Sequence, residues 1–374
     1  MPERSNSNRT DNHRQSYSLT HEGNYTDFTT RSFVQREEVE NKGRNITITN
    51  TLANTQWNLM MLDNHIVTVG AEFADDDLTD PDNINSADLS NRQWSAYVSD
   101  EWQTSVNTSV TAGLRLDDND QFNSHFSPRL FGVWTISDQW TLKGGLSTGY
   151  RTPDLRDMAP GWVQESRGGN IYGNAELEPE TTVSKEVGIY FTGNHRLTAS
   201  LSVFHNDFDD KISLVTCPLD ICNESGARYN INVDEAESEG AEVMLNKDWD
   251  TFSLQGSYAY TSSRQLTGVN AGMPLTQLPR HKATLNPRWK TSEATEIWSR
   301  ITYRGKESEP TVLSSRSIIA PSRTIVDLGV NWTVNEHVEV LTGLYNLFDK
   351  TMRYDEYGFV EDGRRLWLSA NIRF

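Results

Sequence analysis

The feature that most constrains this chain is an alternation of apolar and polar residues with a period of two. It recurs along the whole sequence in segments of about nine to thirteen residues, and no segment keeps a helical period. A period of two puts successive side chains on opposite faces of a β-strand. The sequence therefore predicts an all-β fold with about seventeen strands.

Four segments show the alternation most clearly, and aromatic residues end most of their apolar faces. These faces hold Val106, Thr108, Val110, Ala112, Leu114 and Leu116; Trp140, Leu142, Gly144, Leu146 and Tyr150; Phe252, Leu254, Tyr258 and Tyr260; and Val326, Leu328, Val330 and Trp332. The opposite faces carry charged and polar residues such as Arg115, Asp117, Lys143 and Asp327. Such charges are costly to bury in the core of a β-sandwich, whereas the lumen of a membrane barrel accepts them.

Composition narrows the class further. Only 36% of the 374 residues are hydrophobic, and no run approaches the eighteen apolar residues of a membrane-spanning helix. A transmembrane β-barrel is still allowed, because its strands turn only every second residue to lipid. The net charge of -18 is spread in short clusters, which argues against nucleic acid as a partner.

Short and long links between the expected strands alternate. Short links fall near 334–337, 291–294, 247–250, 192–194, 137–139 and 104–107, and long polar links near 349–362, 305–321, 263–279, 208–235, 151–181 and 118–125. Outer-membrane barrels alternate short periplasmic turns with long outside loops in this way. We therefore expect an antiparallel transmembrane β-barrel with its long links outside, and strand parity puts residues 1–11 outside as well.

Several stretches resemble the carboxy-terminal portion of TonB-dependent outer-membrane receptors, particularly the ferric catecholate siderophore receptors and the colicin I receptor group. They run in the family's order from about residue 94 to Phe374: GLSTGYRTPDLRDMAPG, GNAELEPETTVSKEVGIYF, FHNDFDDKISL, YNINVDEAESEGAEVML, LPRHKATLNPRWK, LYNLFDK and EDGRRLWLSANIRF. Complete family members have a signal peptide, a TonB-contacting segment, a plug and 22 strands. The resemblance thus implies that residues 1–374 form the carboxy-terminal part of such a barrel, with the plug domain absent and the chain cut in mid-barrel.

Some of these motifs are expected to be structural. Asn346 and Asp349 of NLFDK are good turn formers, and Gly240 suits a tight backbone bend where the family's chain re-enters the barrel. Arg364 and Arg365 resemble a family pair at the top of the last strand, where wall salt bridges explain them equally well. The last strand resembles the signal read by the barrel-assembly machinery, carried by Leu368, Ala370, Ile372 and Phe374.

A ferric catecholate is large, aromatic and anionic, so its receptor needs Arg for charge and Trp or Tyr for stacking. The expected outside loops supply Arg151, Arg156, Trp162, Arg167, Tyr172, Arg228, Tyr229, Arg264 and Arg316. We predict these as ligand-binding residues, the alternative being solvated loop residues without a ligand. Arg323, Arg353 and Tyr357 lie in further outside loops.

The two cysteines, Cys217 and Cys222, lie five residues apart in a Pro- and Asp-bearing loop. If oxidised, they would close a small loop and imply an oxidising compartment; free thiols are the alternative. Their proximity favours a disulfide. No further Cys and no His within the loop would complete a zinc site.

No catalytic, metal or cofactor site is predicted. The Asp-rich segment 75–88 lacks the Gly and Glu spacing of an EF-hand, and no His forms a nucleophile motif with Asp or Ser. A haem receptor would need an axial His in a loop, for which His125 and His281 are the nearest candidates. An outer-membrane enzyme is therefore disfavoured.

The resemblance implies a receptor of the Gram-negative outer membrane that takes up ferric siderophores, with catecholates as the nearest resemblance and energy from TonB through the amino-terminal region. The expected partners are the siderophore, TonB, outer-membrane lipids, the barrel-assembly machinery and a docking colicin or phage. Receptors for haem or cobalamin use the same scaffold, and a passive porin or adhesion barrel is the further alternative.

Overall fold

The computed structural model describes residues 11–43, 45–81, 89–159, 161–164, 170–194, 196–268, 270–275, 278–307, 320–357 and 360–373. These residues form nineteen strands and three one-turn helices. The strands before the first helix are β1 (Asn12–Asn24), β2 (Phe28–Asn41), β3 (Ile46–Leu62), β4 (His65–Thr79), β5 (Leu89–Ser105), β6 (Thr108–Asn119), β7 (His125–Thr135) and β8 (Trp140–Arg151). The middle elements are α1 (Leu155–Met158), β9 (Val163–Gln164), β10 (Ile171–Tyr172), β11 (Glu180–Gly193), β12 (Leu197–Thr216), α2 (Leu219–Cys222) and β13 (Arg228–Asp248). The last elements are β14 (Phe252–Gln265), β15 (His281–Ser292), β16 (Thr295–Arg304), β17 (Arg323–Asn335), β18 (Val338–Tyr345), α3 (Tyr354–Tyr357) and β19 (Arg365–Ile372).

The all-β prediction is confirmed. Seventeen of the strands in the described ranges have eight or more residues, as the alternation predicts, and only β9 and β10 are two-residue segments inside a link. The chain divides into two compact units. The first contains Met1–Gly132, Leu146–Val183 and Phe208–Asp234, and the second contains Val133–Gly145, Ser184–Asp207 and Glu235–Phe374.

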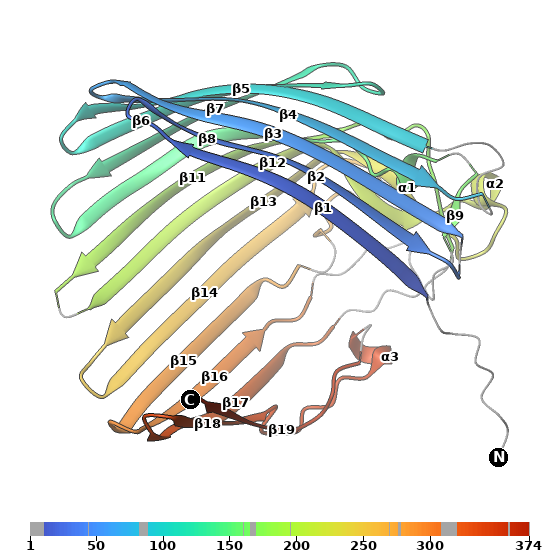
Figure 1. Ribbon diagram of the computed structural model, residues 1–374. Helices are drawn as coiled ribbons and strands as arrows, with labels where there is room; N and C mark the ends of the chain where they lie inside the picture. Colours follow the sequence, from blue (N-terminus) through green and yellow to red (C-terminus); the bar gives the residue numbers. More distant parts are fainter. Residues whose placement is uncertain are drawn as a thin grey trace, which may run out of the picture. The chain divides into compact units, whose positions relative to one another are not determined.

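Strands that follow one another in the sequence pair antiparallel. In the first unit this holds from β1 to β6, where Val34 lies opposite both Leu19 and Ala53. In the second unit it holds from β14 to β19, where Leu328 lies opposite Leu344 and Ser299. Figure 1 shows β14 to β17 side by side, with the tight turn between β15 and β16 at one end. Consecutive strands pair without a crossover, and a short hairpin sets the register of pairs such as β15 and β16, whereas long links join β14 to β15 and β16 to β17.

The predicted link pattern holds with one correction. All six short links lie where the sequence places them, for example 336–337 between β17 and β18. The long link expected at 208–235 is wrong, because β12 continues to Thr216 and β13 begins at Arg228, which leaves only 217–227 between them. The polar residues on either side of 217–227 instead belong to the ends of β12 and β13.

Apolar side chains lie on the exposed face of the strands, the reverse of a soluble sheet. Leu328 and Trp332 on β17 are 40% and 49% exposed, whereas Asp327, which precedes Leu328 and lies on the other face, is 9% exposed. On β6, Leu114 is 44% exposed and Asp117 only 4%. Such an inverted pattern suits strands whose apolar face meets lipid rather than water.

The last strand also exposes its apolar residues, but its other face is largely exposed as well. Leu366, Leu368 and Ile372 on β19 are exposed, and β19 pairs with β18 along its length. Phe374, the final residue of the predicted assembly signal, lies outside the described residues. Among the residues that the structure covers, no helix is long and apolar enough to cross a membrane.

The NLFDK motif is a turn, as predicted. Asn346 and Asp349 both have positive φ, 51° and 56°. The Asn346 side chain donates to the Lys350 carbonyl and accepts from its amide at 2.9 and 2.8 Å.

The prediction for Gly240 is wrong: it lies inside β13, where a Cβ would overlap the Phe204 ring and the Tyr260 carbonyl. Gly240 therefore permits close packing, not a bend.

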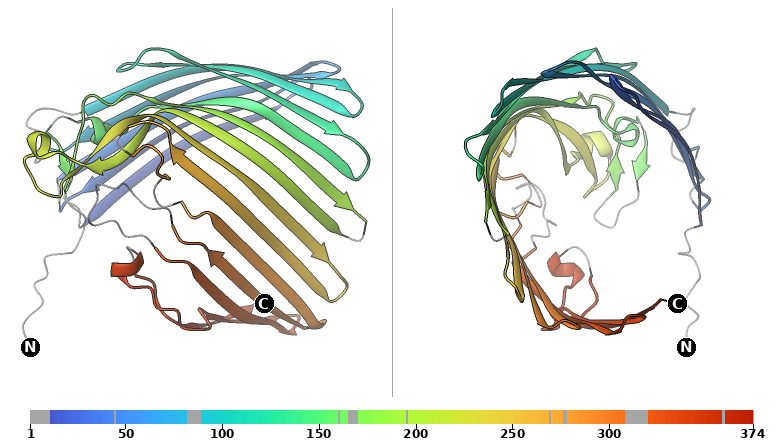
Figure 2. Two further views of the ribbon diagram at one scale, coloured as in Figure 1. Left: turned by 180° about the vertical axis from the view of Figure 1, so that it is seen from behind. Right: turned by 60° about the vertical axis from the view of Figure 1, so that its left-hand side comes forward.

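A small apolar cluster braces the link after β18. Ala320, Met352 and Tyr357 are buried together, with Ile325 of β17 packed against them. Figure 2 shows α3, which contains Tyr357, at the end of β17 opposite the short turns. The links thus have small cores of their own.

Candidate ligand-binding site

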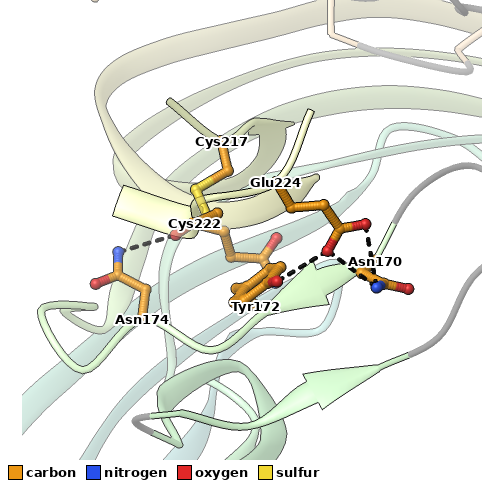
Figure 3. Close-up of a disulfide and its surroundings, with 7 residues drawn as sticks. Asn170, Tyr172, Asn174, Cys217, Cys222 and Glu224 are labelled. Atoms are coloured by element: carbon orange, nitrogen blue, oxygen red, sulfur yellow. Dashed lines mark hydrogen bonds between the residues drawn. A yellow bond between two sulfur atoms is a disulfide. The ribbon is translucent and has the colours of Figure 1, made fainter. Parts of the chain in front are cut away.

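The centre of the candidate site is a disulfide within the link between β12 and β13, in the first unit. Cys217 and Cys222 are bonded, with their Cα atoms 6.0 Å apart, so the predicted pairing is confirmed. They flank α2 and are buried with Ala227, and the rings of Tyr172 and Tyr229 pack against them (Figure 3). The disulfide is therefore the core of a small folded platform at the end of β12 and β13.

Polar contacts tie the segment 170–174 to this platform. The Tyr172 hydroxyl donates to Glu224 Oε2 at 2.8 Å, and the Asn170 amide reaches both oxygens of the same carboxylate at 3.0 and 3.2 Å (Figure 3). The hydrogen bond to Glu224 raises the pKa of the Tyr172 phenol above its usual value. Glu224 thus accepts from two side chains that approach it from a different link.

Backbone pairing completes this connection. β10 runs parallel to the start of β13, with Ile171 opposite Arg228 and Tyr172 opposite Tyr229. The Arg228 amide donates to the Asn170 carbonyl at 2.8 Å, and the Asn174 side chain donates to the Asn230 carbonyl at 2.9 Å. The side chains of Arg228 and Tyr229 are half-buried. These residues build the platform more than they cover its surface.

Trp162 anchors a second part of the same link. It is 2% exposed, and its indole N–H donates to Asp80 Oδ2 at 2.7 Å. Ala159 and Leu89 pack on it, and the Arg156 guanidinium lies 5.7 Å from its ring centroid. Because its ring is buried and its polar atom is satisfied, Trp162 holds the link in place rather than offering a face to a ligand.

The helix α1 carries the charges next to this anchor. Arg151, at the end of β8, is exposed and lies 3.6 Å from Asp154. Burial raises the pKa of the Asp157 carboxyl, the negative charge of Asp154 adds to this, and a hydrogen bond from Asn230 opposes it. Of the predicted cations of this link, Arg151 is exposed, whereas Arg156 is half-buried over the Trp162 ring.

The other predicted residues are dispersed. Arg264 lies in the second unit, on β14, where its guanidinium holds Glu237 Oε1 at 2.6 and 3.0 Å. Arg167 and Arg316 lie outside the described residues. Of the further candidates, Arg323 lies over the Tyr357 ring at 5.5 Å and Arg353 pairs with Glu356 at 3.1 Å.

The remaining candidates have structural partners. His125 stacks on the Tyr150 ring at 4.5 Å, and His281 Nδ1 lies 2.8 Å from the Tyr258 hydroxyl. Within the Asp-rich segment, Asp75 binds Arg92 at 3.1 Å, and 82–88 lie outside the described residues. Arg365 lies over the Tyr345 ring at 5.8 Å and 3.5 Å from Asp362, which fits the salt-bridge alternative.

Sequence reasoning missed the residues that hold the platform together. Glu224 and Asn170 join two links, and Asn174 joins its link to Asn230 of β13. The side chain of Asn232, on β13, donates to the carbonyls of Glu178, in the preceding link, and Asp210, on β12, at 2.9 and 2.6 Å. The Asn-rich stretch YNINVD is a signal that could have indicated them, because a side-chain amide can donate hydrogen bonds to backbone carbonyls that have no strand partner. We call the structure formed by residues 170–174, 217–230 and Asn232 the disulfide platform.

Comparisons with known proteins agree with this architecture. The family model described as TonB dependent receptor-like, beta-barrel, matches residues 3–347. The Iron-regulated outer membrane virulence protein of Vibrio cholerae serotype O1 is 42% identical over 368 residues, which cover 95% of this chain and 56% of the relative. The Ferric enterobactin receptor PirA of Pseudomonas aeruginosa is 26% identical, covering 97% and 57%. The chain thus spans a little over half the length of these relatives.

Solved structures show the same fold. The siderophore receptor PirA from Acinetobacter baumannii superposes with a TM-score of 0.81 at 22% identity, covering 97% of this chain and 62% of that one. PirA from Pseudomonas aeruginosa gives a TM-score of 0.79 at 25% identity, covering 96% and 64%. With the family model matched over most of its length, this chain belongs to the TonB-dependent receptor-like β-barrel family of the outer membrane.

Proposed function

We propose that this chain provides the barrel wall and outer loops of a receptor that takes up ferric siderophores of the catecholate class. The observation that carries the proposal is a pair of guanidinium groups next to the Trp162 anchor: Arg151 is exposed, and Arg156 is half-buried over the Trp162 ring. The disulfide platform adjoins α1, because the Asn174 amide donates to the Asp157 carbonyl. Guanidinium groups on an ordered platform suit a large anion with aromatic faces, because they pair with charge and stack on rings.

Relatives support the same proposal from another direction. Proteins named as ferric enterobactin receptors occur among them in Pseudomonas aeruginosa and Escherichia coli. In the complete protein, TonB would supply the energy for release and transport, and the strands described here would form the wall around the path. The chain is proposed to bind and transport its ligand, without catalysing a reaction.

Cobalamin is the second candidate ligand, since a Vitamin B12 transporter of Photobacterium profundum is 24% identical over 284 residues. Haem has less support, because the rings of His125 and His281 contact Tyr150 and Tyr258. Neither ligand class explains the surface guanidinium groups as well as a ferric catecholate, which carries several negative charges.

The test is ligand binding to the protein purified from outer membranes in detergent. We expect quenching of tryptophan fluorescence by a ferric tris-catecholate, with binding at least about tenfold weaker in the Arg151→Ala, Arg156→Ala double variant, because hydrogen bonds to charged groups contribute about 1.5–3 kcal/mol. Arg31→Ala is the matched control, since Arg31 is an exposed arginine of the same unit that lies on β2. Equal affinity in both variants would contradict the assignment of Arg151 and Arg156, and saturable binding of cyanocobalamin alone would contradict the ligand class.

A further inference from the structure

Three potential metal ligands converge on β12 and β13 in the second unit. One ligand atom each from His205, Asp207 and Glu237 lies within 4.8 Å of the others. The two strands are in contact here, because the Asn206 side chain donates to the Ser238 hydroxyl at 3.2 Å. Nothing in the proposed siderophore function uses this cluster.

The cluster faces the same way as the apolar residues of these strands. On β12, Leu201 and Val203 precede His205 at two-residue spacing and are 44% and 48% exposed. On β13, Val243 and Leu245 follow Glu237 at even spacing and are also exposed. Side chains two residues apart share a face of a strand, so the three ligands lie on the lipid-facing side.

Their height along the strands puts them beyond the apolar band. Phe252 and Trp289 mark one aromatic end of that band and Tyr260 marks the other, eight residues further along β14, about 26 Å at the rise of a strand. Tyr260 lies opposite Ala241, and Arg264 lies opposite Glu237. Measured along the strands, the cluster is therefore about 13 Å past Tyr260, at the level of lipid head groups.

The charges around the cluster leave ligand atoms available. Lys185 Nζ binds Asp207 Oδ2 at 2.8 Å. The other carboxylate oxygen, Asp207 Oδ1, contacts His205 Nε2 at 2.8 Å. Arg264 holds Glu237 through Oε1 alone. Glu239 Oε2 lies 3.9 Å from His205 Nδ1 and adds a further negative charge. Three carboxylates thus face two permanent cations, which leaves a negative potential at the imidazole.

From this geometry we propose that His205, Asp207 and Glu237 bind one divalent transition-metal ion of the zinc class at the outer rim, on the lipid-facing side of the barrel. An imidazole nitrogen with two carboxylate oxygens is a donor set that suits Zn²⁺ or Co²⁺, whereas Ca²⁺ and Mg²⁺ prefer oxygen ligands throughout. The ion takes the place of the contact between His205 and Asp207, and Lys185 and Arg264 act as its competitors.

The experiment uses Co²⁺ as a visible probe on the detergent-purified protein, followed by displacement with Zn²⁺. We expect one saturable site with the absorption of a nitrogen- and oxygen-ligated Co²⁺, and affinity at least about tenfold lower in His205→Ala and in Glu237→Gln, because each removes one of three ligands. Lys185→Met should tighten binding, since it removes a competing cation. A purely structural role for the cluster would not produce that increase.

His281→Ala is the matched control, because His281 contacts the exposed Tyr258 on β14 and is not one of the three ligands. Its variant should bind the ion as the wild type does. Equal Co²⁺ affinity in wild type and His205→Ala, or the absence of a saturable site, would overturn the proposal. Heat-dependent mobility on gels shows whether each variant is folded, and catecholate binding is independent of either outcome.

Discussion

The backbone amide of Asn346 donates to Asp327 Oδ1 at 2.9 Å, which joins the NLFDK turn to the polar face of β17. Asp327 is buried, and Asn346 holds a positive φ that few residues tolerate. The contact therefore fixes the direction in which the chain leaves β18. It also explains why a motif that the sequence marks as a turn is tied to the barrel wall.

Replacing Asp327 should weaken the second unit. We expect Asp327→Ala to lower the free energy of unfolding by about 1–3 kcal/mol, because it leaves the Asn346 amide without this acceptor in a buried position. The measurement is urea unfolding in detergent, followed by tryptophan fluorescence. Thr333→Ala, at an exposed position of the same strand, should change little. A loss of similar size in both variants would contradict the role of the contact.

Gly329 should tolerate no side chain. A Cβ at this position would lie 2.3 Å from the Trp298 ring and 2.4 Å from the Thr342 carbonyl, so Gly329→Ala forces either the ring or the backbone to move. Overpacking of this kind costs about 1–3 kcal/mol. Gly256→Ala is the control, since its Cβ would meet only Leu285 at 3.4 Å. We expect the temperature of heat-modified gel mobility to fall for the first variant alone.

The Tyr172 phenol should titrate late. Because its hydrogen bond to Glu224 raises its pKa in the folded protein, this pair contributes stability that is present below the ordinary tyrosine pKa of about 10 and is lost as pH rises through the folded value. Ultraviolet difference titration of wild type against Tyr172→Phe isolates this group. Glu224→Gln should move its midpoint back toward the ordinary value, and an unchanged midpoint would contradict the assigned cause.

Asp157 should respond to pH in the same direction. Its pKa is raised by burial and by Asp154, so its contribution to stability is fully present below the unfolded pKa of about 4 and is lost as pH rises through the folded value. In the Asp157→Asn variant, the link between β8 and β11 (152–179) should therefore be cleaved by protease more slowly than in wild type at pH 7, and this difference should shrink toward pH 3. Asp154→Asn should show part of this gain. No pH dependence would contradict the raised pKa.

Loss of the disulfide should loosen the platform without unfolding the strands. A closed loop of this length constrains the unfolded chain by about 2 kcal/mol in the chain-entropy model. We expect the Cys217→Ser, Cys222→Ser variant to be cleaved faster by protease between 217 and 230 and to bind a ferric catecholate more weakly. Gel mobility after heating should stay near that of wild type, and a collapse of that mobility would show a wider role.

The strands were predictable because their period is local. On β17, apolar residues such as Leu328 and Trp332 alternate with polar ones such as Asp327. This alternation can be read without knowing which residues elsewhere in the sequence contact the strand, so the sequence identifies the strand and its two faces. The ends of β12 and β13 were missed because their sequences, as in NDFDDK and NVDEAE, are polar on both faces, so the alternation that marks a strand is lost there. Local patterns thus describe the wall better than its rim.

The ligand residues show where sequence reasoning stops. Two of the predicted ligand residues, Trp162 and Tyr172, hold the structure together through Asp80 and Glu224, which lie 82 and 52 residues away in the sequence. A local sequence pattern does not identify hydrogen-bond partners that lie so far away in the sequence. The same reasoning found Cys217 and Cys222, because their spacing alone allows the pair.

Strand length has a consequence for where a ligand first meets this protein. β3 and β5 each have seventeen residues, about 56 Å at the rise of a strand, whereas the apolar band of an outer-membrane barrel is about 25 Å tall. Even with a tilt of about 40°, part of each strand stands clear of the lipid. With the long links outside, as the strand parity predicts, a diffusing solute meets this protein rim before it reaches the level of the bilayer.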